Sequence, residues 1–196
     1  LRGALAGDGC EVIEMGIVPD AAEALEEAVR AGLEQADLVL LSGGSSLGAG
    51  DLVTETISKL GQMLVHGVAV KPGKPVVVGS VKGPGEDGEV EKLVIGLPGY
   101  PMSALSDYYI FVQPYLRRAM GVHTQPAFLE ATLARKHPST IGRNEFLPVR
   151  LEGTSAIPLT KGSSSISALA AADGFVEIDE NTEVVEQGER VKVRLF

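Results

Sequence analysis

The chain has 196 residues, of which 44% are hydrophobic and 22% are charged, an ordinary balance for a folded globular protein. Its net charge of −9 argues against a general nucleic-acid binder, which would carry a basic excess. The single cysteine, Cys10, excludes an intrachain disulfide, and no Cys–His cluster suggests zinc. Neither a membrane-spanning apolar run nor a signal peptide is recognisable, so we expect a cytoplasmic protein with no membrane partner.

Residues 1–122 alternate between strand and helix patterns, which predicts an α/β domain with a largely parallel sheet. Leu1 to Gly7 resembles the end of a helix already under way, so we expect a piece of a longer protein. Strands are expected over Glu11 to Ile17, Asp37 to Ser42, Gly67 to Val70, Pro75 to Gly79 and Leu93 to Ile95, and helices over Ala21 to Glu34, Val53 to Leu60 and Pro101 to Met120, the last kinked by Pro114.

Residues 123–196 show short strand patterns separated by turns, and no helical period is sustained. This texture predicts a small all-β, barrel-like domain after the α/β domain. The expected domains are therefore residues 1–122 and 123–196. The strands expected in the second are Phe128 to Arg135, Glu145 to Leu151, Ala156 to Leu159, Phe175 to Ile178 and Arg190 to Leu195.

A glycine-rich loop, Gly43 to Gly50, follows a strand and precedes a helix, so its amides could hold a phosphate. It matches neither the Walker A pattern nor the dinucleotide-binding pattern, and a tight connection is the simple alternative. Asp51 closes the loop. Its carboxylate suits a helix N-cap, and it equally suits a place beside phosphates where a divalent cation intervenes.

Two lysines flank a tight turn in Lys71-Pro72-Gly73-Lys74. A turn brings their Cα atoms within about 7 Å, where two positive charges repel by about 0.6 kcal/mol in water and about 2.4 kcal/mol at an effective dielectric constant near 20. On an open surface this repulsion is tolerable and the lysine pair indicates no function, whereas in a cleft the two positive charges favour a bound anion. Because ligands of α/β sheets bind at the carboxyl ends of strands, we expect these lysines to meet the other loops at one edge of the sheet.

A third segment at a strand end is Leu97-Pro98-Gly99-Tyr100-Pro101, where Pro101 suits the first turn of a helix beside Gly99 and Ser103. Tyr100 is interpreted either as an aromatic ring that stacks on a ligand or as an exposed ring on the surface. In the second domain, Ser163 lies in a polar turn that could offer donors to a ligand. The three histidines have no partner spacing and are interpreted as structural or solvated.

At these residues the sequence resembles the MoeA family, the molybdopterin molybdenumtransferases related to the gephyrin E domain. The segments that carry the resemblance are Ser42 to Asp51, Val70 to Pro75, Gly96 to Ala104, Glu145 to Val149, Lys161 to Ser163 and Ala172 to Ile178. It covers essentially the whole chain and implies a MogA-like three-layer α/β domain followed by the family's C-terminal β-barrel domain.

The resemblance implies a homodimeric enzyme that inserts molybdate into adenylylated molybdopterin, with loss of AMP and use of Mg²⁺. On this reading Asp51, Lys71 and Lys74 are catalytic residues: the lysines hold molybdate or phosphate charge, and Asp51 places the metal ion. The ligand is an anionic pterin phosphate or nucleotide. The residues expected to bind substrate are Gly43, Gly44, Ser45, Ser46, Gly48, Pro98, Gly99, Tyr100, Pro101, Ser103 and Ser163.

Two departures from the family pattern affect substrate detail: Ser45-Ser46-Leu47 replaces the usual Val-Ser-Val of the glycine-rich loop, and Tyr100 replaces an asparagine. Because family elements that precede Leu1 are not in the sequence, we expect the chain to be inactive alone. Two alternatives remain, a non-catalytic scaffold of the same fold and a nucleotide pyrophosphatase of the competence-damage type. The retained Asp51 and lysines favour the enzyme over the scaffold, and the pyrophosphatase has no place for the C-terminal barrel.

Overall fold

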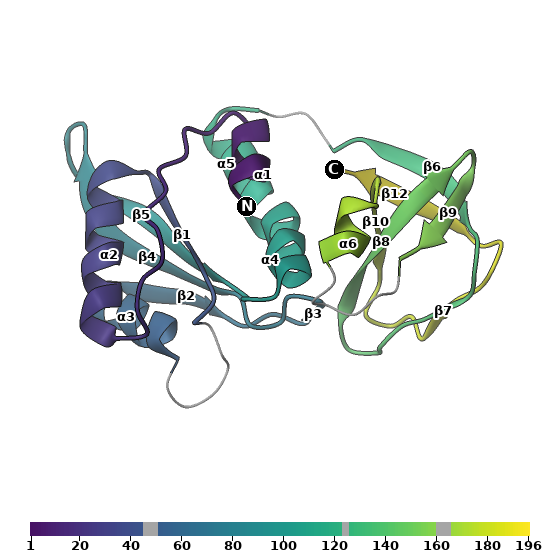
Figure 1. The fold of residues 1–196 in the computed structure, drawn as a ribbon, viewed down its shortest axis with the longest axis horizontal. Coiled ribbons are helices and arrows are strands. Elements are labelled where there is room, and N and C mark those ends of the chain that lie inside the picture. Colours follow the sequence, from purple (N-terminus) through teal and green to yellow (C-terminus); the bar gives the residue numbers. More distant parts are fainter. Residues whose placement is uncertain (45–50, 123–125, 160–165) are drawn as a thin grey trace. The chain divides into compact units, whose positions relative to one another are not determined.

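The structure, a computed structural model, describes residues 1–44, 51–122, 126–159 and 166–196. Its contacts divide the chain into two compact units, shown with their elements in Figure 1. Unit 1 comprises residues 1–68 and 73–99, and unit 2 comprises residues 69–72 and 100–196. No helix within the described ranges is long and apolar enough to cross a membrane.

Unit 1 is built on a four-stranded sheet with the strand order β1-β5-β4-β2. Strand β1 pairs with β5 in parallel, whereas β4 pairs with both β5 and β2 in antiparallel fashion. The elements of this unit are α1 (Arg2–Gly7), α2 (Ala22–Gln35), β1 (Leu38–Ser42), α3 (Leu52–Leu60), β2 (Gln62–His66), β4 (Val77–Gly85) and β5 (Gly88–Leu97).

Helices α2 and α3 pack on this sheet because each buries one apolar stripe. In α2, the buried Leu25, Val29 and Leu33 recur at the four-residue spacing of a single helix face. Helix α3 approaches the strands closely at Gly79, where an added Cβ would lie 2.0 Å from Cγ2 of Ile57. The resulting core is made of Leu25, Val29, Leu33, Val39, Val53, Ile57, Val77, Val81 and Val94.

The α/β class of the first domain is confirmed, but its sheet is mixed rather than largely parallel. Strands β4 and β5 form a hairpin that turns at Gly85 and Gly88, and a hairpin connection makes neighbouring strands antiparallel. The strand expected over Glu11 to Ile17 is wrong, since these residues form no ladder. An apolar pattern becomes a strand only where a partner supplies hydrogen bonds, and the side chain of Ile17 is fully exposed.

Unit 2 begins its main segment with a helical stretch made of three pieces. Helix α4 (Pro101–Asp107) passes into a π-helix, η1 (Tyr108–Val112), which leads into α5 (Gln113–Ala119). The long helix expected over Pro101 to Met120 therefore contains a wider turn rather than a simple kink. Pro114 lies in the first turn of α5, where its missing N–H is tolerated, and the π-turn directly precedes it.

The rest of unit 2 is a closed β-barrel, as the sequence predicts. Its sheet runs β10-β12-β6-β9-β8, and an additional β10–β8 pairing closes the ring, while β3 adds to β8 in parallel. The elements are β3 (Val70–Lys71), β6 (Phe128–Leu133), β7 (His137–Pro138), β8 (Asn144–Glu152), β9 (Ser155–Pro158), α6 (Ile166–Ala170), β10 (Gly174–Ile178), β11 (Val184–Val185) and β12 (Arg190–Leu195).

Arg194 of β12 ties the helical stretch to the barrel within unit 2. Its Nη2 donates to the carbonyl of Tyr109 at 2.8 Å and to Oε1 of Gln113 at 3.2 Å. The guanidinium also lies 5.4 Å from the ring centre of Phe175, a cation–π distance. Only 8% of Arg194 is exposed, so the charge is buried with partners that satisfy it.

Candidate functional site

Two of the expected loops lie side by side at one edge of the sheet in unit 1. The parallel register pairs Ser42 with Leu97, the last residues of β1 and β5. Just beyond that pair, the amide of Gly43 donates to the carbonyl of Leu97 at 3.1 Å. A Cβ on Gly99 would come within 3.4 Å of the Cα of Gly43, so the two loop backbones are in contact. This edge presents Gly43, Gly44, Pro98 and Gly99 together.

Lys74 reaches the same edge by a different route from the one expected. It precedes β4, an antiparallel strand, and the first residue of that strand, Val77, pairs with Gly96 near the end of β5. The carbonyl of Lys74 accepts from the amide of Val68 at 3.0 Å, which fixes the backbone, while the side chain is exposed. An exposed ammonium thus lies three residues before the strand start, at the edge occupied by Gly43 and Gly99.

Asp51 acts as the N-cap of α3, one of the two roles that the sequence leaves open. Its Oδ1 accepts from the amide of Thr54 at 3.1 Å, and its Oδ2 accepts from Oγ1 of Thr54 at 2.8 Å. The residue is only 6% exposed. A carboxylate has about four lone-pair sites, so after these two contacts it still has a lone pair with which to bind a cation. Its charge and remaining lone pairs therefore fit Mg²⁺, which typically takes one or two carboxylates together with substrate phosphates.

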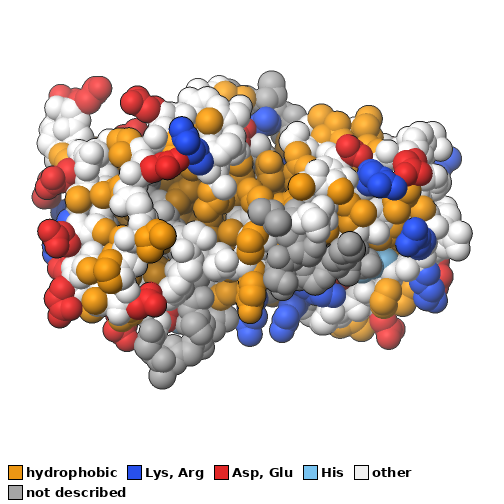
Figure 2. Space-filling view, in the orientation of Figure 1, with side chains coloured by type: hydrophobic (Ala, Val, Ile, Leu, Met, Phe, Trp, Pro, Cys, Tyr) orange, Lys and Arg blue, Asp and Glu red, His pale blue; other side chains and the backbone are white. Residues whose placement is uncertain are grey.

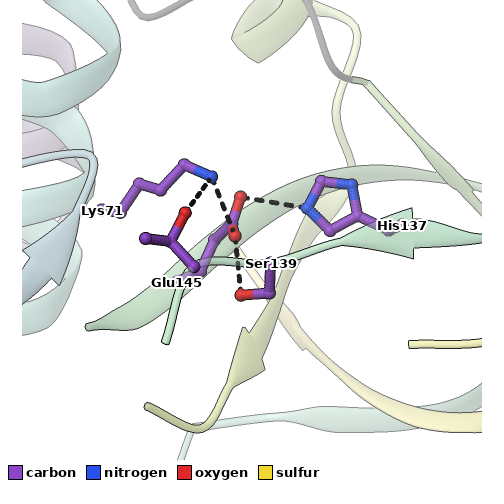
Figure 3. Close-up of polar contacts among 5 residues, drawn as sticks. Lys71, His137, Ser139 and Glu145 are labelled. Carbon is purple, nitrogen blue, oxygen red and sulfur yellow. Dashed lines mark hydrogen bonds and ion pairs between the residues drawn. The ribbon is translucent and has the colours of Figure 1, made fainter. Parts of the chain in front are cut away.

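Lys71 belongs to unit 2, and its ammonium is paired there. Strand β3 places it opposite Glu145 of β8, and Nζ donates to Oε2 of that residue at 3.1 Å. Nζ also lies 3.2 Å from Oγ1 of Thr140. Figure 3 shows the acid between Lys71 on one side and His137 and Ser139 on the other. The side chain of Lys71 remains 40% exposed.

Glu145 is the centre of this cluster. His137 Nε2 lies 3.0 Å from Oε1, and Oγ of Ser139 donates to Oε2 at 2.9 Å. Burial by itself would raise the pKa of the Glu145 carboxyl, but hydrogen bonds from His137, Ser139 and Lys71 outweigh it and bring the pKa below its ordinary value. The carboxylate is therefore held ionised and hydrogen-bonded inside the fold.

Sequence reasoning did not connect Glu145 and His137 with Lys71. His137 is buried and hydrogen-bonded, in keeping with the structural interpretation of the histidines, but its partner was not foreseen. A usable signal was the buried run that follows Glu145 in β8, since an acid on the inward face of a strand needs partners. Which partners these are depends on the β3–β8 pairing, which joins residues far apart in the sequence.

Three further expected site residues lie at the start of α4, in unit 2. Tyr100 is the N-cap residue and is 61% exposed, and Pro101 occupies the first helical turn as expected. Ser103 is 5% exposed, so it is less open to a ligand than its position in the motif implies. The expected site residues Ser45, Ser46, Gly48 and Ser163 lie outside the described residues.

A largely apolar hollow of about 620 Å³ in unit 1 lies between the residues before α2, the helix itself and β1. Its lining includes Met15, Leu25 and Val39, and it ends at Gly43 and Gly44. None of the expected lysines lines it. Within the described ranges, no group of three or more His, Cys, Asp or Glu residues is arranged to hold a metal ion.

Comparison with known proteins identifies the family to which this chain belongs. Residues 1–118 match the family described as "Probable molybdopterin binding domain", and residues 130–196 match the "MoeA C-terminal region (domain IV)". The chain therefore belongs to the molybdopterin-binding domain family, in the form that carries the MoeA C-terminal region. The resemblance to MoeA that the motifs indicate is confirmed.

Individual relatives are similar to this chain over nearly all of its length. The molybdopterin molybdenumtransferase of Haemophilus influenzae is 31% identical over 195 residues, which cover 95% of this chain and 46% of that protein. Molybdopterin molybdenumtransferase 1 of Mycobacterium tuberculosis is 32% identical over 198 residues, covering 95% and 45%. The crystal structure of the molybdopterin biosynthesis MoeA protein from Pyrococcus horikosii superposes with a TM-score of 0.84 at 40% identity, covering 100% of this chain and 47% of that one. The chain thus spans less than half the length of these relatives.

Proposed function

We propose that this chain contributes to molybdenum cofactor biosynthesis as part of a molybdopterin molybdenumtransferase. The reaction is the insertion of molybdate into adenylylated molybdopterin with release of AMP. The observation that carries the proposal is the meeting of Gly43, Gly44, Pro98, Gly99 and the exposed Lys74 at one edge of the unit 1 sheet. Glycine backbone, which a ligand can approach closely, and an ammonium at the carboxyl ends of strands suit a phosphate-bearing ligand.

The residues are assigned complementary roles. Lys71 and Lys74 reduce the repulsion between molybdate and the substrate phosphates, two anions that must approach each other. The amides of the loop that begins at Gly43 hold phosphate oxygens. Asp51 supplies a ligand to Mg²⁺, which when bound stabilises charge as the phosphoanhydride bond breaks. Tyr100, whose exposed ring replaces the family's asparagine, is assigned to contact with substrate, as are Pro101, Ser103 and the residues Ser45, Ser46, Gly48 and Ser163.

The same proposal covers the domain border, the cellular location and the oligomeric state, and it is favoured over the two alternative functions. The domain border between 1–122 and 123–196 is supported by the family matches at 1–118 and 130–196. We also assign the protein to the cytoplasm, as expected from the sequence, and to a homodimer, on the family resemblance. The MoeA C-terminal match speaks against a competence-damage pyrophosphatase, which has no place for this barrel. A pure scaffold would have no need of Asp51 and the two lysines.

Asp51→Asn separates the two roles of the carboxylate. Asparagine is as good an N-cap as aspartate, so the thermal midpoint should stay within about 2 °C of the parent chain. The Mg²⁺-dependent gain in affinity for pyrophosphate, measured by calorimetry on the 196-residue chain, should be lost because the amide provides a far weaker ligand. An intact Mg²⁺ effect would show that Asp51 is only a cap.

Lys74→Met tests the anion-binding edge directly. The variant should bind pyrophosphate about tenfold more weakly, since a charge-assisted hydrogen bond is worth about 1.5 kcal/mol or more. Lys82→Met is the matched control, because Lys82 is also exposed but lies near the turn of the β4–β5 hairpin, away from the sheet edge that holds Gly43 and Gly99. Equal affinity in both variants would contradict the site.

We further expect no molybdate-dependent AMP release from adenylylated molybdopterin by the chain alone, and clear release would overturn that expectation.

A further inference from the structure

Lys71 differs from Lys74 because a buried acid holds it in place. Glu145 has 8% of its side chain exposed and receives hydrogen bonds from two groups besides the lysine, His137 and Ser139. These two contacts fix the carboxylate whether or not Lys71 is present. The carboxylate of Glu145 therefore has a fixed position and can hold the ammonium of Lys71 in place (Figure 3).

The geometry leaves part of the ammonium open. An ammonium has three N–H donors. Within the described residues, Nζ of Lys71 contacts two oxygens, Oε2 of Glu145 and Oγ1 of Thr140. One N–H is thus left for a ligand, and the 40% exposure of the side chain gives a ligand access to it. The β3–β8 pairing fixes the lysine backbone directly opposite the acid.

We propose that Glu145 is a positioning residue for anion binding by Lys71. Together with Thr140 it sets the direction of the remaining N–H, so that a tetrahedral oxyanion such as phosphate or molybdate meets an ammonium already in place. His137 and Ser139 act through Glu145 by holding its carboxylate. The inference rests on the proposed function, because it assumes that Lys71 takes part in anion binding.

Two effects of Glu145 on an incoming anion oppose each other. Its negative charge cancels part of the attraction of Lys71, which would weaken binding. Its hydrogen bond removes the rotational freedom of a long, flexible side chain, which would strengthen binding because that freedom need not be lost again. Since the carboxylate is buried and shares its charge with three donors, we expect the positioning effect to be the larger.

The test is the affinity of the 196-residue chain for sodium pyrophosphate and, separately, for sodium molybdate, measured by isothermal titration calorimetry. Lys71→Met should weaken binding about tenfold, and Glu145→Gln should weaken it about threefold or more. The double variant should bind no more weakly than Lys71→Met, because the acid acts only through the lysine. Glu186→Gln is the matched control, as it breaks an exposed ion pair with Lys136 in the same unit.

Tighter or unchanged binding by Glu145→Gln would overturn the inference, and so would a double variant in which the two losses add. Normal binding by Lys71→Met would remove Lys71 from the anion site and would refute both this inference and that part of the proposed function. Weak binding by Lys71→Met with normal binding by Glu145→Gln would refute the positioning role alone. If Glu145→Gln does not fold, the exposed Thr140→Val serves instead: its affinity should fall about twofold, and parent-level affinity would overturn the proposal.

Discussion

At the level of single residues, Asp107 has the least favourable environment among the described residues. It ends helix α4, is 0% exposed, and neither carboxylate oxygen has a hydrogen-bond partner in the part of the chain that the structure describes. Burial raises the pKa of this carboxyl to about 8. The group is therefore largely protonated at neutral pH, because an unpaired charge inside the protein is costly.

This carboxyl should make the folded chain less stable as the pH rises. Below about pH 4 it is protonated in both the folded and the unfolded chain. Between that pH and about 8 the unfolded chain releases the proton while the folded chain retains it, so the free energy of unfolding falls by roughly 1.4 kcal/mol per pH unit. Glu145 acts in the opposite sense, since its lowered pKa removes stability only as the pH falls below about 4.5.

Asp107→Asn should abolish that slope, because the amide does not titrate in this range. The variant should match the parent chain below about pH 4, and its free energy of unfolding should exceed that of the parent by about 1.4 kcal/mol near pH 5 and by several kcal/mol near pH 8. Urea unfolding at a series of pH values gives the comparison. Parallel pH profiles for the two proteins would mean that Asp107 is ionised with a partner in the fold.

The sequence predicts some of the site residues well and others only in part. Asp51 follows a glycine-rich loop and precedes a helical pattern, and these local features indicate a helix N-cap as one of its two roles, which the contact with Thr54 confirms. The partner of Lys71 lies 74 positions away, and no local pattern links the two. Residues paired through backbone register between separate strands are found only once the topology is known.

At the level of elements, the C-terminal end of helix α2 is capped by a side chain from strand β5. Nζ of Lys92 in β5 donates to the carbonyls of Leu33 and Ala36 at 2.8 and 3.0 Å. The last carbonyls of a helix have no partner within the helix, so these contacts satisfy two of them. Lys92 is only 7% exposed, which makes it a buried cation placed at the negative end of the helix dipole.

Lys92→Met should therefore destabilise unit 1. The apolar stem is retained, but two helix carbonyls lose their donor, at an expected cost of about 1–3 kcal/mol in the free energy of unfolding. Lys82→Met, at an exposed position on the neighbouring strand β4, should change that free energy by less than about 0.5 kcal/mol. Urea titration of both variants provides the measurement. A similar small effect in both would show that water replaces the lost donor.

The elements themselves show where a sequence pattern is sufficient. Helix α2 and strand β1 were predicted to within two residues because their periodicity is strong and their flanking residues are clear. The π-turn of η1 was missed because it arises from a change in hydrogen-bond spacing that the apolar pattern does not reveal. The mixed sheet was missed because strand direction depends on how the strands are connected and paired, and here the β4–β5 hairpin makes two neighbouring strands antiparallel.

At the level of the whole molecule, charge is divided unevenly between the two units. Unit 1 has 6 basic and 15 acidic residues, whereas unit 2 has 11 of each, so the net charge of −9 falls on unit 1. In Figure 2, red acidic side chains predominate over the part of the view that holds α2 and α3. An anionic ligand at the edge near Lys74 must therefore be held by local groups against the overall field of its unit.

The two units also have separate hydrophobic cores. The core of unit 1 includes Ile57, and the core of unit 2 is made of barrel residues such as Val149 and Val193, with no residue in common. Both Ile57 and Val149 are 0% exposed. Regions with their own cores often open independently below the free energy of global unfolding.

Ile57→Ala should loosen unit 1 alone. Truncating a fully buried isoleucine costs about 2–5 kcal/mol, and the loss is felt by the elements that share its core. In native-state hydrogen exchange, the slowest amides of β4 and β5 should exchange faster, while those of β8 and β10 should keep the parent rates. Val149→Ala is the reciprocal variant and should accelerate β8 and β10 only. Equal acceleration of all four strands by either variant would show that the two cores unfold as one cooperative structure, and the separation argued from their residues would then be wrong.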